Sequence, residues 1–186
     1  MKNVIQIGAN IGDDHVTKFL RKYSYDKVLL VEAHPLCMSG LFENYNGWNN
    51  VSIECAIISH TNNIVKNLWY NPDTNYQLSS TKEGFNPLHS NRVRLNLPNF
   101  TFDQLVEKHG FEDVNILFMD IESQDEYLIK SIDFNKYNID FLVWEQQHSD
   151  MNKETIDRLT SFGFKTKKIH ANTMAWRNDL KFDIEL

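Results

Sequence analysis

The sequence predicts an α/β fold of the Rossmann-like, doubly wound type, with a mostly parallel seven-stranded sheet and a C-terminal antiparallel hairpin. Three observations predict it. An apolar strand, a glycine turn and a helix pattern open the chain at residues 4–20. Strand and helix patterns then alternate, which requires parallel strands joined by right-handed crossovers. Near the C-terminus, two strand patterns are separated only by residues 170–172, a hairpin-like spacing.

Length and composition indicate one globular domain over residues 1–186, because the chain is 41% hydrophobic and 24% charged. No apolar run approaches the roughly 20 residues of a membrane-spanning helix, so we expect no membrane partner. The first strand begins almost at Met1, which leaves no room for a signal peptide, and we expect a cytoplasmic protein. Cys37 and Cys55 form no metal-type or redox-type pair. A net charge of −6 argues against a nucleic-acid partner.

The first strand, Val4 to Ile7, stops at Gly8, and Gly12 follows just before the first helix. Residues without a Cβ let a backbone approach a ligand closely, and the N–H groups at a helix start face that ligand. The spacing is G-x-x-x-G with Asn10 in the middle, so the G-x-G-x-x-G pattern of dinucleotide sites is not met. The turn therefore predicts a ligand site of another kind.

The second strand, Lys27 to Glu32, ends in a carboxylate that can accept two hydrogen bonds from a ribose diol. An adenosine-containing ligand without a diphosphate fits this pair of features best, and S-adenosyl-L-methionine is the common one. A glycine after the first strand also occurs in α/β domains for structural reasons alone, and that interpretation stays open here.

A second helix is expected from Pro35 to Tyr45, and strands at 51–56 and 64–70. The segment from Asn71 to Asn99 is then irregular and rich in Asn, Ser, Thr and Pro, which is unusual inside a compact domain unless it is functional. We expect a substrate-side insertion that covers the acceptor, with Tyr76, Arg92 and Arg94 facing it. The alternative is a surface loop.

A helix at 101–109, capped by Thr101, precedes a buried strand at 114–119 that ends in Asp120-Ile121-Glu122. Carboxylates at the end of a central strand lie where open α/β sheets bind ligands. Further along, we expect a helix through 127–132, a strand at 139–145, a helix at 152–162 and strands at 164–169 and 173–176. Residues 182–186 are expected to extend the edge.

Several pieces, in order along the chain, resemble the FkbM family of class I S-adenosylmethionine-dependent methyltransferases. They are residues 8–13 (GANIGD), 31–35 (VEAHP), 50–56, 101–105 (TFDQL), 120–122 (DIE) and 143–145 (VWE) with His148. The resemblance implies methyl transfer from S-adenosyl-L-methionine to an oxygen, often a hydroxyl of a sugar, a glycan or another small molecule. The family usually has glycine after its D-x-E, whereas this chain has Ser123, which leaves the shape of the acceptor side open.

The resemblance also implies roles for particular residues. The methionine part of the cofactor would contact Gly8, Ala9, Asn10 and Gly12, the ribose Glu32, and the adenine surroundings Ala56; Asp13, Ala33 and Asp120 complete the expected cofactor set, and Glu145 joins the acceptor side.

Methylation of a hydroxyl is aided by a base, and His148 is preferred because an unperturbed histidine titrates near neutrality. Asp120 and Glu122 are the other candidates. The structural alternatives are a solvated loop histidine and caps on the following helix. Together with Glu145 these residues offer ligands that suit magnesium or manganese, but their spacing matches no metal motif, and we assign no metal. Two rival functions remain, a nicotinamide oxidoreductase and a non-catalytic S-adenosylmethionine-binding module.

Overall fold

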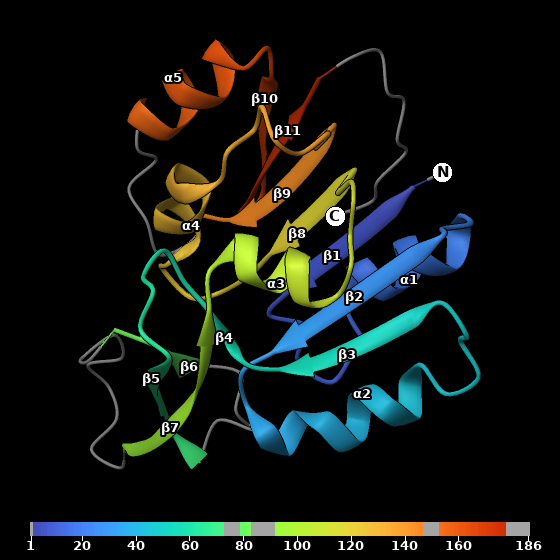
Figure 1. The fold of residues 1–186 in the computed structure, drawn as a ribbon, viewed down its shortest axis with the longest axis vertical. Coiled ribbons are helices and arrows are strands. Elements are labelled where there is room, and N and C mark those ends of the chain that lie inside the picture. The colour runs from blue at the N-terminus through green and yellow to red at the C-terminus, as the bar shows by residue number, and fades with distance from the viewer. Residues whose placement is uncertain (1, 73–78, 83–91, 147–152, 178–186) are drawn as a thin grey trace.

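The computed structural model describes residues 2–72, 79–82, 92–146 and 153–177. Its main sheet has seven strands in the order β10-β11-β9-β8-β1-β2-β3 (Figure 1). The strands are β1 (Asn3–Ile7), β2 (Lys27–Glu32), β3 (Val51–Cys55), β8 (Ile116–Met119), β9 (Phe141–Glu145), β10 (Lys165–Ile169) and β11 (Asn172–Trp176). All neighbours pair in parallel except β11, which is antiparallel to both β9 and β10. The predicted α/β class with a mostly parallel sheet is confirmed.

Helices cover both faces of this sheet because its strands are apolar on both faces. Side chains alternate along a strand, so Ile5 and Ile7 pack with α3 (Phe102–Lys108), α4 (Asp125–Ser131) and α5 (Lys153–Ser161). Val4 instead packs with α1 (His15–Lys22) and with α2 (Met38–Asn44), which follows a 3₁₀ turn, η1 (Pro35–Cys37). Two hydrophobic cores result, one on each face. Within the described part of the chain, no helix is both long and apolar enough to cross a membrane.

A second, four-stranded sheet lies beyond the carboxyl ends of β2 and β3 (Figure 1). We call it the small sheet, and its strand order is β4 (Ile57–Ile58), β7 (Val93–Phe100), β5 (Val65–Tyr70) and β6 (Ser79–Ser80). Leu68 and Leu97 are buried against Ile57 in its own small core.

The small sheet corrects the expectation that regular structure lapses from Asn71 to Asn99. Residues 93–100 form the longest strand of the molecule's described part, paired antiparallel with β5 over six residues. Leu95 and Leu97 alternate with polar neighbours, as a strand with one buried face requires. Asn96 and Pro98 favoured a loop in the sequence, because strands are depleted in both residue types. Tyr76, His148 and residues 182–186 lie outside the described residues.

Candidate active site

Four residues form a row along the carboxyl ends of the central strands. In the sheet register Val31, Ile7, Met119 and Trp144 are successive partners on β2, β1, β8 and β9. The residue that follows each of them therefore lies beside its neighbours, which gives the row Glu32, Gly8, Asp120 and Glu145. The row spans the point where the chain order reverses around β1, and this is where open α/β sheets bind ligands.

Gly8 lets two strand ends approach each other more closely than any side chain would permit. A Cβ at this position would lie 1.9 Å from the backbone oxygen of Asp120, and the φ angle of Gly8 is +85°. The backbone N–H groups of Gly8 and Ala9 both donate to the carbonyl of Val31, at 2.9 and 3.0 Å. The glycine loop is thus tied to β2 on one side and lies against β8 on the other.

Glu32 is held in place by the loops on either side of it. The backbone N–H of Asn10 donates to Oε2 at 2.9 Å, and the N–H of His34 donates to Oε1 at 2.6 Å. Burial raises the pKa of Glu32, and the two N–H donors oppose that rise by stabilising the charged form. A carboxylate offers about four acceptor positions, so Glu32 can still accept a hydrogen bond from a ligand beside its backbone N–H donors.

A hollow of about 690 Å³, which includes space open to solvent, borders Glu32, Gly8 and Asp120 of this row. Its walls come from the ends of the main strands and from the small sheet. They include Gly8, Asn10, Glu32, Ala33, Ala56, Ile57, Ile58, Leu68, Ser79, Ser80, Thr81, Asp120, Glu122 and Gln124. A smaller hollow of about 270 Å³ shares Gly8 and Asp120 with it and also touches Gln6 and Asp14. Gly8 therefore lines both hollows.

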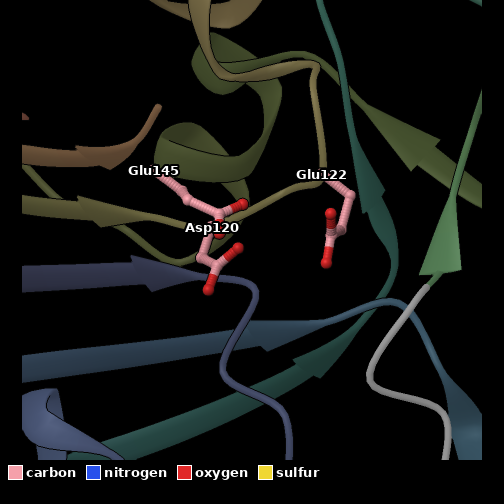
Figure 2. Close-up of side chains that lie close together, drawn as sticks. All are labelled: Asp120, Glu122 and Glu145. Atoms are coloured by element: carbon pink, nitrogen blue, oxygen red, sulfur yellow. The ribbon is translucent and has the colours of Figure 1, made fainter. Parts of the chain in front are cut away.

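Three carboxylates, two of which line the larger hollow, lie close together (Figure 2). One oxygen from each of Asp120, Glu122 and Glu145 lies within 4.8 Å of the others. Asp120 and Glu145 end adjacent strands, and Glu122 points into the same space from the loop that follows β8 (Figure 2). Oxygen ligands suit a hard cation, but these three alone define no coordination shell, and the fourth ligand considered from the sequence, His148, lies outside the described residues.

Crowding of the three groups favours their protonated forms. Burial, followed by the charge of Glu145, raises the pKa of Asp120 to about 7, even though its side chain is exposed to the hollow. Burial and the charges of Glu145 and Asp120 raise the pKa of Glu122 to about 8. Interaction with the Glu145 carboxyl group raises the pKa of Asp120 further, and the same interaction opposes the rise that burial causes in the pKa of Glu145. A carboxyl group of this kind can exchange a proton near neutral pH.

The structure brings part of the expected cofactor set together at the hollow: Gly8, Asn10, Glu32, Ala33, Ala56 and Asp120. Ala9 is instead fully buried in the core under α1. Gly12 packs against α2, where a Cβ would lie 2.6 Å from the ring of Tyr45. Asp13 is exposed and borders neither hollow.

On the acceptor side, Glu122 and Glu145 lie with Asp120, but the two arginines do not border the hollow. Arg92 and Arg94 are exposed beside or on β7, and the Arg94 guanidinium lies 6.0 Å from the ring centre of Trp69. Arg94 therefore stacks on the small sheet itself.

Sequence reasoning missed the residues that the small sheet supplies, namely Ile57, Ile58, Leu68 and residues 79–81. Ile57 and Ile58 directly follow Ala56, which the sequence already predicted to lie near the adenine, so these two residues could have been predicted with it. It also missed Asp14, which caps α1 by accepting from the Thr17 N–H at 3.0 Å and accepts from Gln6 Nε2 at 2.7 Å. Aspartate before an amphipathic helix is a recognisable cap signal.

Comparisons with known proteins find one family model and several solved structures that match this chain. A methyltransferase FkbM domain model matches residues 6–166. The methyltransferase FkbM from Methylobacillus flagellatus KT superposes with a TM-score of 0.57 at 11% identity, over 94% of this chain and 43% of that one. The precorrin-6y C5,15-methyltransferase from Geobacter metallireducens GS-15 gives 0.50 at 12% identity, over 95% of this chain and 80% of that one.

At these identities the two solved structures establish the fold alone, and the chain spans less than half the length of the first. No curated protein matches the sequence. The domain model, in contrast, covers most of the chain and includes the glycine loop, Glu32, Asp120 and Glu145. On that basis, the chain belongs to the FkbM family of methyltransferases.

Proposed function

We propose that this protein transfers a methyl group from S-adenosyl-L-methionine to a hydroxyl oxygen of a small acceptor such as a sugar or glycan. The observation that carries the proposal is the row Glu32, Gly8, Asp120 and Glu145. It joins a diol-binding carboxylate to a proton-accepting pair, with only the glycine between them.

The larger hollow suits an adenosine. Glu32 would accept hydrogen bonds from both ribose hydroxyls, because each of its oxygens is already oriented by one backbone N–H. Ile57, Ile58 and Leu68 offer an apolar surface to the adenine. In the smaller hollow, the Asp14 carboxylate would face the ammonium of the methionine end.

S-adenosyl-L-methionine supplies an electrophilic methyl group on a sulfonium and leaves as S-adenosylhomocysteine. The protein's part is to hold the acceptor oxygen in line with that group, which by itself provides much of the acceleration. The ionised member of the Asp120–Glu145 pair would accept the hydroxyl proton as the oxygen attacks, and the pKa of about 7 for Asp120 suits that transfer. Glu122 and Glu145 would also accept hydrogen bonds from neighbouring acceptor hydroxyls. His148, the base preferred from the sequence, stays a prediction.

The test is methyl transfer from methyl-deuterated S-adenosyl-L-methionine to a panel of mono- and oligosaccharides and other polyols, followed by mass spectrometry. We expect a mass gain on one acceptor and a molar equivalent of S-adenosylhomocysteine. Asp120→Asn should lower turnover at saturating S-adenosyl-L-methionine by about two to four orders of magnitude. His148→Ala, assayed in parallel, separates the two candidate bases.

Cofactor binding without transfer to any hydroxylated acceptor would overturn the oxygen acceptor and indicate a different one. Full activity of Asp120→Asn would remove Asp120 from the proton-accepting role.

A further inference from the structure

The loop after β8 contains two successive residues in the left-handed backbone region. Glu122 has φ 49° and Ser123 has φ 69°. Residues with a Cβ rarely adopt this conformation, and it persists only where the surrounding structure holds it. Neither residue is a glycine, so the chain adopts the turn without the residue best suited to it. A contact from outside the turn helps to hold it.

That contact comes from the small sheet. The Ser80 hydroxyl on β6 donates to the backbone carbonyl of Glu122 at 3.1 Å. The same hydroxyl oxygen accepts from the backbone N–H of Lys82 at 3.1 Å. Ser80 is only 3% exposed, so water competes little for either hydrogen bond. Its strand pairs with β5 through Trp69, which anchors it in the small sheet.

The position of the turn determines where the Glu122 carboxylate lies. Asp120 and Glu145 directly follow paired residues of β8 and β9, whereas Glu122 extends toward them from the loop that follows β8 (Figure 2). A relaxed turn would carry Glu122 away from the pair and leave Asp120 and Glu145 in place.

We propose that Ser80 is a positioning residue of the active site, which holds the left-handed turn at Glu122 and thereby keeps the Glu122 carboxylate against Asp120 and Glu145. The small sheet is then part of the catalytic architecture as well as a wall of the hollow. The catalytic consequence of this inference depends on the proposed function, but the structural consequence does not.

Removing the Ser80 hydroxyl should release Glu122 from its charged neighbours. The pKa of Glu122 is raised to about 8 by burial and by the charges of Glu145 and Asp120. In a relaxed loop both causes weaken, so the pKa of Glu122 falls toward the ordinary value for a glutamate. A role for Ser80 in stability alone would not move this pKa in a protein that remains folded.

The experiment is a carboxyl ¹³C NMR titration of the full chain labelled on glutamate Cδ, with the Glu122 resonance assigned from Glu122→Gln. Four proteins are compared: wild type, Ser80→Ala, Ser80→Thr and Ser161→Ala. Ser80→Thr keeps the hydroxyl. Ser161→Ala is the matched control, because Ser161 also donates to a backbone carbonyl, that of Arg158 at 2.7 Å, but on α5.

We expect Ser80→Ala to lower the pKa of Glu122 by about one pH unit or more. Ser80→Thr and Ser161→Ala should titrate like the wild type. An unchanged Glu122 pKa in a folded Ser80→Ala protein overturns the inference. If Ser80→Ala does not fold, a lowered Glu122 pKa in Ser80→Cys, whose thiol is a weaker donor, supports the inference, and a wild-type pKa there overturns it.

Titration with S-adenosylhomocysteine separates this inference from the proposed function. Absence of binding by the wild type would count against the proposed function and leave the positioning role of Ser80 intact. Normal binding together with an unmoved Glu122 would refute only the positioning role.

Discussion

Replacement of Gly8 by alanine tests whether the close approach of β1 and β8 is a structural requirement of the site. The new Cβ would lie 1.9 Å from the backbone oxygen of Asp120 and 2.8 Å from its backbone carbon. Neither atom can move freely, because the Asp120 N–H donates to the carbonyl of Ile7 at 2.9 Å. The strand ends must separate, and the row of site residues is disrupted at its centre.

The cost has two parts that a control separates. A left-handed φ angle costs an alanine about 1–2 kcal/mol, and overpacking against backbone adds about 1–3 kcal/mol. Gly47 has φ +84°, and a Cβ there meets nothing within 4 Å. Gly47→Ala therefore carries only the first cost, and Gly8→Ala should lose about 2–5 kcal/mol in total.

Urea denaturation of the two variants measures the difference, with the slope of the transition checked for two-state behaviour. Calorimetric titration with S-adenosylhomocysteine should show lost binding for Gly8→Ala and wild-type binding for Gly47→Ala. Equal destabilisation of the two variants, with binding retained in both, would refute the close-approach argument.

Two further predictions concern the carboxylates. Glu32→Ala should weaken binding of S-adenosylhomocysteine by about 1.5–3 kcal/mol, the range for hydrogen bonds to a charged group. The control is Glu43→Ala, which should leave binding unchanged because Glu43 is exposed. An unchanged affinity of Glu32→Ala in calorimetry would remove Glu32 from the ribose role. Glu122 has a pKa raised from 4.5 to about 8 in the folded state, so its contribution to stability is fully present below pH about 4.5 and is lost as the pH rises through about 8. Because solvent reaches the hollow, we expect the unfolding free energy of the wild type to fall by about 2–4 kcal/mol relative to Glu122→Gln between pH 5 and 8, and parallel curves would contradict the raised pKa.

The elements that sequence reasoning located are those whose signal is local. The strand from Val4, the turn at Gly8 and the capped helix after Thr101 each carry their pattern within a few neighbouring residues, and all three occur in the structure. The Thr101 cap is a full capping box with Gln104. Parallel pairing of the strands then followed from the alternation of strands and helices.

The strand from Val93 to Phe100 was missed because its pattern is weak locally and its partner is distant. Its exposed face carries Arg94, Asn96 and Pro98, which resembles loop composition. Its buried face can be recognised only after β5 is placed beside it, and more than twenty residues separate the two strands in the sequence. Burial in a second core, and not propensity, determines this strand.

The residues of the site also differ in how far their positions could be predicted from the local sequence. From the sequence, Glu145 was grouped with Asp120 and Glu122 as a possible cation ligand, and the register of β8 with β9 brings Glu145 beside Asp120 in the structure. The left-handed backbone conformations of Glu122 and Ser123 could not be predicted from the sequence, because neither residue type indicates such a conformation. The hydrogen bond from Ser80 to this turn depends on the small sheet and could not be foreseen without it.

The central claim is that the row at the carboxyl ends of β2, β1, β8 and β9 is a binding site for S-adenosyl-L-methionine. The most direct measurement is isothermal titration of the purified wild-type protein with S-adenosylhomocysteine and, separately, with NAD⁺. We predict one molecule of S-adenosylhomocysteine bound per chain and no saturable binding of NAD⁺, because the glycine loop lacks the pattern that holds a diphosphate. Saturable binding of NAD⁺ with none of S-adenosylhomocysteine would contradict the claim.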